Sequence, residues 1–68
     1  MVDARGLLCP MPVVMVQNEV KKSAPQTLEV LVDNRVAVEN IRRYAALQRY
    51  ETDVREADGE YTLTLRRP

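Results

Sequence analysis

The residues best suited to chemistry lie together at positions 6–12, in the order Gly-Leu-Leu-Cys-Pro-Met-Pro. This segment holds the only cysteine of the 68-residue chain, one of its two glycines and two of its four prolines. A cysteine thiolate is a strong nucleophile, and the amino-terminal end of a helix favours the thiolate because unpaired backbone N–H groups and the positive end of the helix dipole lie there. With Gly6 as a flexible joint ahead of it, the segment predicts that Cys9 is a nucleophile presented at a helix start.

The two prolines define how the cysteine would be presented. Proline suits the first turn of a helix, where the backbone N–H has no intrahelical acceptor. We therefore expect Pro10 to be the first helical residue and Cys9 to be the N-cap, held in extended geometry because it precedes a proline. Neither Pro10 nor Pro12 can donate a hydrogen bond, so the amides of Met11 and Val13 would remain free to face the sulfur.

A lone cysteine also has a simpler interpretation as a small buried hydrophobic residue. Packing alone gives no reason for two prolines directly after Cys9, which favours the chemical interpretation. The chain has no histidine and no second cysteine, which excludes a Cys/His zinc site, a Cys–His catalytic pair and an internal disulfide. We expect no metal and no cofactor.

Composition restricts the partners and the compartment. Ten basic residues balance ten acidic ones, so overall charge predicts no strong binding to nucleic acid or to membranes. The sequence contains neither an apolar run long enough to span a bilayer nor a recognisable signal peptide. Together with a single free thiol, these features predict a cytoplasmic protein.

The hydrophobic pattern predicts the element order βαβαββ. The expected elements are a short strand within residues 1–5, a helix over 10–22, a strand over 27–32, a helix from the capping residues Asp33 and Asn34 to about 48, and a hairpin of residues 50–55 and 61–66 that turns at Asp58-Gly59. Strands joined by a helix should run parallel and the hairpin antiparallel. We therefore expect an α/β (α+β) two-layer sandwich, with a four-stranded mixed sheet and both helices on one face.

Several of these residues match a known signature. Asp3, Gly6 and the run Cys9-Pro10-Met11-Pro12 resemble the amino-terminal signature of the TusA/SirA family of small sulfur-carrier proteins, with its Cys-Pro-x-Pro (CPxP) motif. The resemblance covers the whole chain, because the βαβαββ order is also the layout of that family. It identifies residues 1–68 as a single TusA/SirA-like domain.

The second half of the chain is similar to a particular subgroup. The matching positions are Val32-Asp33-Asn34, Ala37, Glu39-Asn40-Ile41, Arg43-Tyr44-Ala45 and Tyr50-Glu51. They resemble the amino-terminal domain of YedF-type proteins, in which a DsrE-like domain follows. The chain is then either a single-domain relative or a fragment of a longer YedF-type protein.

The resemblance implies a function for Cys9. It would accept sulfane sulfur from a donor protein such as a cysteine desulfurase or a rhodanese, hold it as a persulfide, and relay it to an acceptor protein. Such a protein is a sulfurtransferase-like carrier rather than a stand-alone enzyme. Pro10 and Pro12 would shape the turn, and Asp3 and Gly6 would support it. Many TusA-type carriers have an acidic residue where this chain has Met11, so roles in tRNA thiolation, sulfur oxidation or selenium metabolism all stay open.

Two further interpretations remain. Leu7, Leu8 and Met11 would form an apolar rim around Cys9, or they would simply pack within the loop or the core. The whole chain would instead be a non-catalytic RNA-binding, protein-binding or regulatory module, with a structural or vestigial Cys9 and a link to selenium metabolism. The residues that such a module would use are arginines, namely Arg42, Arg43, Arg49, Arg66 and Arg67.

Overall fold

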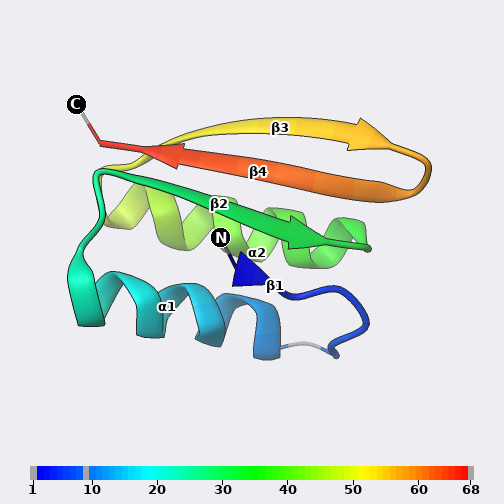
Figure 1. Ribbon diagram of the computed structural model, residues 1–68, viewed down its shortest axis with the longest axis horizontal. Coiled ribbons are helices and arrows are strands. Elements are labelled where there is room, and N and C mark those ends of the chain that lie inside the picture. Colours follow the sequence, from blue (N-terminus) through cyan, green and yellow to red (C-terminus); the bar gives the residue numbers. More distant parts are fainter. Residues whose placement is uncertain (1, 9, 68) are drawn as a thin grey trace.

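The computed structural model describes residues 2–8 and 10–67 of the chain. Its elements, in order, are β1 (Val2–Asp3), α1 (Met11–Ser23), β2 (Thr27–Val32), α2 (Arg35–Leu47), β3 (Glu51–Ala57) and β4 (Glu60–Arg66). This order confirms the βαβαββ prediction (Figure 1).

The four strands form one mixed sheet in the order β1-β2-β4-β3. β1 runs parallel to β2, whereas β4 is antiparallel to both β2 and β3. The two interior strands are therefore β2 and β4, and the sheet edges are β1 and β3. β2 is rich in aliphatic residues, as its interior position requires: its alternate residues Leu28, Val30 and Val32 are buried, whereas Thr27 and Glu29 are exposed on the other face.

Both helices lie on the same side of the sheet, as Figure 1 shows. Between the two layers, alternate residues of β2 and β4 meet apolar residues from one stripe of each helix. The core residues without exposed surface include Val30, Leu63 and Leu65 of the sheet, Val16 of α1, and Ile41 and Ala45 of α2. The observed fold is thus the expected two-layer α+β sandwich.

The opposite face of the sheet is polar and open. Strand positions between the core residues point to it, because successive side chains of a strand alternate between faces. They line a broad, shallow hollow that includes Glu29, Asp53, Arg55, Thr62 and Thr64.

The β3–β4 hairpin closes with the predicted two-residue turn. Asp58 and Gly59 both have positive φ, 53° and 77° respectively. This is the geometry of a type I′ turn, whose twist matches that of the flanking strands. Elsewhere, in the part of the chain that the structure describes, no helix is long and apolar enough to cross a membrane.

Candidate functional site

The loop between β1 and α1 lies at one end of the molecule, together with the first turn of α1, which holds Met11 and Pro12 of the Cys-Pro-x-Pro motif. β2 ends and α2 begins at the same end (Figure 1, right). The first turn of α1 faces the first turns of α2 across a hollow of about 10 Å³, which has room for about one water molecule. Its lining residues are Pro10, Pro12, Val13, Asn34, Ala37 and Asn40.

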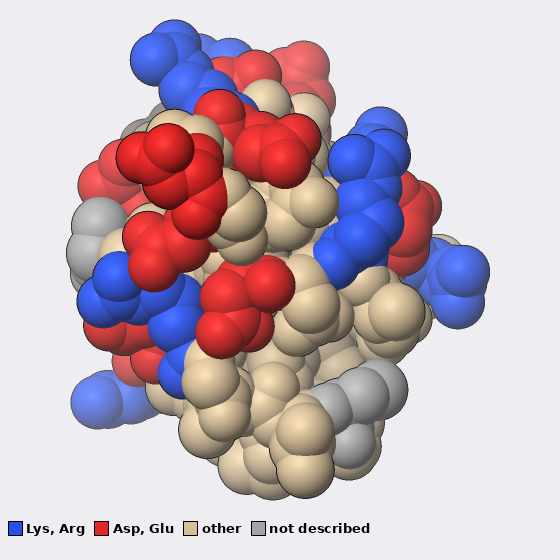
Figure 2. Space-filling model, turned by 90° about the vertical axis from the view of Figure 1, so that its right-hand side faces the viewer, with Lys and Arg blue, Asp and Glu red and all other residues tan. Residues whose placement is uncertain are grey.

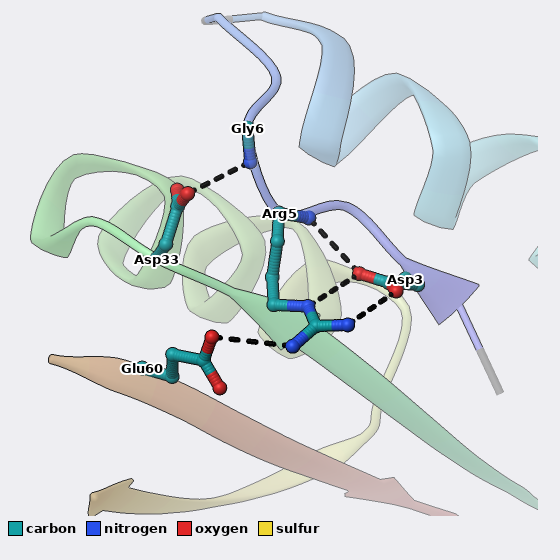
Figure 3. A network of polar contacts seen from close by, with 5 residues as sticks. All are labelled: Asp3, Arg5, Gly6, Asp33 and Glu60. Atoms are coloured by element: carbon teal, nitrogen blue, oxygen red, sulfur yellow. Dashed lines mark hydrogen bonds and ion pairs between the residues drawn. The ribbon is translucent and has the colours of Figure 1, made fainter. Parts of the chain in front are cut away.

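Gly6 is tethered to the end of β2. Its N–H donates to an oxygen of the Asp33 carboxylate at 2.7 Å (Figure 3). Gly6 has a φ of +75°, a conformation that side chains on L-residues disfavour. Just before it, the N–H of Ala4 donates to the carbonyl of Leu31 at 2.8 Å. The loop therefore leaves the sheet with two contacts to the chain around the end of β2.

Arg5 joins three elements through a small ionic network (Figure 3). Its guanidinium donates to both carboxylate oxygens of Asp3, at 2.9 and 2.8 Å, and to Glu60 at the start of β4, at 3.2 Å. Its backbone N–H also donates to Asp3. The side-chain hydrogen bonds from Arg5, followed by the backbone one, lower the pKa of Asp3 to about 2, and the same carboxylates raise the pKa of Arg5.

The start of α1 differs from the prediction by one residue. Pro10, with φ −100° and ψ 18°, is the N-cap, and the helix begins at Met11, so Pro12 rather than Pro10 lies in its first turn. The reason is a turn that closes before the helix, in which the N–H of Met11 donates to the carbonyl of Leu8 at 2.9 Å. This bond occupies the Met11 amide, which the sequence analysis expected to be free.

The start of α2 agrees with the prediction. Asn34 is the N-cap in extended geometry, and its side-chain oxygen accepts from the N–H of Ala37 at 2.8 Å. Asp33, expected to help cap this helix, instead holds Gly6. The sequence pattern did not predict the bond from Gly6 to Asp33 or the bond from Arg5 to Glu60. The two residues of these pairs lie 27 and 55 positions apart in the chain, and no local pattern marks contacts of that range.

Two of the three rim residues are exposed. Leu8 is 84% exposed and Met11 is 46% exposed, while Leu7 packs partly against the core. Val36, in the first turn of α2, adds a third exposed apolar side chain. Figure 2 looks onto this end, where uncharged surface fills the lower part and acidic side chains gather in the upper part.

Cys9 itself lies outside the described residues, so its catalytic role stays a prediction. The supporting residues are placed: Asp3 and Gly6 belong to the contacts above, Pro10 is the exposed N-cap, and Pro12 is buried in the first turn of α1. Among residues 2–8 and 10–67, no cluster of acidic, cysteine or histidine residues could hold a metal ion.

The five arginines of the alternative binding module do not share one surface. Arg42 lies on α2 beside Glu39, with 3.8 Å between their charged groups. Arg66 lies at the open face on the other side of the sheet. Arg67 is engaged within the chain, since its guanidinium lies 4.5 Å from the Tyr50 ring centre and donates to the carbonyl of Gln48.

Comparison with known proteins identifies the class and then the family. A solved SirA-like protein from Desulfitobacterium hafniense is similar in structure, with a TM-score of 0.84 and 28% sequence identity over 94% of this chain and 90% of that one. The family model described as sulfurtransferase TusA matches residues 1–67. The chain therefore belongs to the TusA sulfurtransferase family, whose members are sulfur-relay carriers that interact with other proteins.

Proposed function

We propose that Cys9 carries sulfane sulfur as a persulfide between two partner proteins. The observation that carries this proposal is the coincidence of a family match over residues 1–67 with a Cys-Pro-x-Pro run in which Cys9 is the only thiol. The donor would be a protein persulfide, such as that of a cysteine desulfurase or a rhodanese. The acceptor is a second protein, because the chain has no other thiol to take the sulfur.

The transfer step needs no oxidant. The Cys9 thiolate attacks the terminal sulfur of the donor persulfide, a new S–S bond forms on Cys9, and the donor thiolate leaves with the electron pair of the broken S–S bond. The second transfer repeats the same exchange, with Cys9 as the leaving thiolate and the acceptor thiolate as the nucleophile. In each step one persulfide is consumed and one is formed, so no net oxidation or reduction occurs.

The surroundings of the motif support transfer to a protein rather than to an enclosed small molecule. The hollow beside the loop, at about 10 Å³, is far below the hundreds of Å³ of a typical ligand pocket. Leu8 and Met11, the exposed residues on either side of the Cys9-Pro10 pair in sequence, offer apolar surface to a partner. Apolar side chains of this kind bind protein surfaces by removing water from both.

The start of α1 suits an anionic sulfur. Its first turn, residues 11–14, contains no acidic side chain, so no carboxylate competes for the positive end of the helix dipole. A persulfide is more acidic than a thiol, and anions are stabilised at helix amino termini.

We further propose that residues 1–68 act as one TusA/SirA-like domain, either alone or as the first domain of a YedF-type protein. The support is that all six elements contribute to one layered fold. The similar SirA-like protein is covered over 90% of its own length. The proposal places the reaction in the cytoplasm, where a lone thiol is kept reduced.

Intact mass spectrometry tests the proposal directly. The protein is incubated with a cysteine desulfurase, its pyridoxal phosphate and free cysteine, and the mass is measured before and after a reductant is added. We expect the wild type to gain the mass of one sulfur atom and to lose it on reduction.

Cys9→Ser is the matched control, because it removes the thiol and keeps a side chain of similar size. It should gain no sulfur. Absence of a mass gain on the wild type with several desulfurase and rhodanese donors would overturn the proposal and favour the interpretation in which Cys9 is structural or vestigial.

A further inference from the structure

β3 (Glu51–Ala57) is a long strand with one free edge. Among the residues that the structure describes, it is hydrogen-bonded along its length to β4 alone, and it ends the sheet order β1-β2-β4-β3. Figure 1 shows it along the outer side of the sheet. An uncovered edge of seven residues offers a row of backbone N–H and C=O groups to another strand. Charged side chains on an edge oppose most such pairing, so Glu51, Asp53, Arg55 and Glu56 restrict which strand and which register β3 accepts.

The charged residues of β3 can lie opposite residues of the other sign on β3 of a second copy of the chain. Asp53 and Arg55 point to the open face, on either side of Val54, which packs partly against the core. In an antiparallel pair related by a two-fold axis, the residue at the centre lies opposite itself and its neighbours exchange places. With Val54 at the centre, Asp53 of each copy lies opposite Arg55 of the other.

The neighbouring registers of the same symmetry are all unfavourable. Centring the pair on Asp53, Arg55 or Glu56 would place that residue opposite its own copy. Centring it on Thr52 would set Glu51 opposite Asp53. Like charges directly opposite each other destabilise a strand pair, and opposite charges stabilise it. Among the interior positions of the strand, only the register centred on Val54 therefore avoids repulsion.

We propose that β3 pairs with β3 of a second copy of this chain, antiparallel and centred on Val54, and so joins two four-stranded sheets into one of eight strands. Asp53 and Arg55 are available for this pairing. Their charged groups are 3.7 Å apart within one chain, and the two side chains are 52% and 84% exposed respectively. The cross-strand arrangement gives each of them an opposite charge directly across the interface.

The pairing leaves the sulfur-relay site accessible. Residues 4–8 and Pro10 follow β1, which is at the opposite edge of the sheet from β3. Because the paired strands run antiparallel, the two loops point away from each other at opposite ends of the dimer. Each copy can then meet its own partner, so this proposal stands independently of the chemistry at Cys9.

Sedimentation equilibrium on the full chain over a concentration series tests the dimer. We expect the wild type to approach twice the monomer mass as concentration rises. Asp53→Arg and Arg55→Asp each place two pairs of like charges across the interface, so each should weaken the dimer by about tenfold or more. The double variant Asp53→Arg/Arg55→Asp exchanges the two charges and should restore the dimer.

Glu29→Arg is the matched control, since it makes the same charge change on the open face but on the interior strand β2. It should leave the dimer unchanged, and circular dichroism should show that all four variants are folded. A wild type that stays monomeric over the series would overturn the proposal. So would a dimer that the single variants do not weaken or the double variant does not restore.

Discussion

The two helices begin side by side at the motif end of the molecule, and they begin by different means. α2 starts with Asn34, whose side chain accepts the N–H of Ala37 at 2.8 Å. α1 starts with Pro10, which has no side-chain acceptor, and with a second proline, Pro12, in its first turn. The α2 start is therefore stabilised by its own cap, whereas the α1 start depends on ring constraints and on contacts outside the helix.

Those outside contacts come from the segment that precedes the motif. Gly6 is held by Asp33, and Arg5 is held by Asp3 and Glu60. A side-chain cap on α1 would use the same backbone groups that can stabilise an anionic sulfur. The difference between the two helix starts therefore teaches that the chain fixes the motif by contacts that precede it. No side chain caps the start of α1, although the N–H of Met11 is already bonded to the carbonyl of Leu8.

Pro12→Ala should have the largest effect on stability among the changes at these helix starts. The ring is buried, so its loss removes about two buried methylene groups at about 0.8 kcal/mol each. It also releases a constraint on the unfolded chain that is worth about 0.4–1 kcal/mol. We expect the free energy of unfolding, measured in urea, to fall by about 2 kcal/mol.

Pro10→Ala is the control for that change. Pro10 is exposed, and its φ of −100° is far from the angle that the ring prefers. It should lower the free energy of unfolding by less than about 1 kcal/mol. Equal losses for Pro10→Ala and Pro12→Ala would contradict the view that the buried ring of Pro12 fixes the start of α1.

Gly6→Ala should have the next largest effect on stability, because it strains the backbone at the residue that Asp33 holds. A Cβ on Gly6 would have no atom within 4 Å, so the change creates no clash. Its cost is the left-handed backbone alone, about 1–2 kcal/mol for an L-residue. Gly6→Asn, whose side chain tolerates that conformation better, should recover part of the loss in the same urea titration; no recovery would show that the backbone conformation is not the cause.

The fold was largely predictable from the sequence, because its signals are local. The strand over residues 27–32, the Asp58-Gly59 turn and the Asn34 cap each depend on a few adjacent residues, and each was predicted correctly. The sequence did not predict that β4 lies between β2 and β3, since strand order is set by pairing between distant segments. The bonds from Arg5 to Glu60 and from Gly6 to Asp33 were missed for the same reason. The start of α1 was wrong by one residue because the bond from Met11 to Leu8 closes a turn that proline preferences alone do not reveal.

Asn34→Ala should have a smaller effect, confined to α2. It removes the acceptor for the Ala37 N–H, and loss of an N-cap costs about 1 kcal/mol. Asn34→Ser keeps an acceptor and should stay close to the wild type. The Asn34 side chain also donates to the Asp33 carboxylate at 3.4 Å, and Asp33 holds Gly6. Sulfur loading of the folded Asn34→Ala protein should still match that of the wild type, since the bond from Gly6 to Asp33 does not itself involve Asn34; a large loss of loading would mean that the two helix starts are not independent.

The smallest expected effect is that of acid on the segment that leads from β1 to α1. Arg5 lowers the pKa of Asp3 from 3.8 to about 2 in the folded chain. Because the folded pKa is the lower one, the stabilisation from this pair is complete above about pH 4 and is lost as the pH falls towards 2. An NMR titration of the Asp3 carboxyl carbon should therefore give a midpoint near 2, and Arg5→Gln should return it towards 3.8.

The Asn34–Ala37 cap of α2 involves no titrating group, so the amide of Ala37 should keep its protection from hydrogen exchange over that pH range while that of Arg5 loses it. A wild-type midpoint near 3.8 would mean that Arg5 does not hold Asp3 in solution, and the segment before α1 would then be held by the bonds from Gly6 to Asp33, from Arg5 to Glu60 and from Ala4 to Leu31.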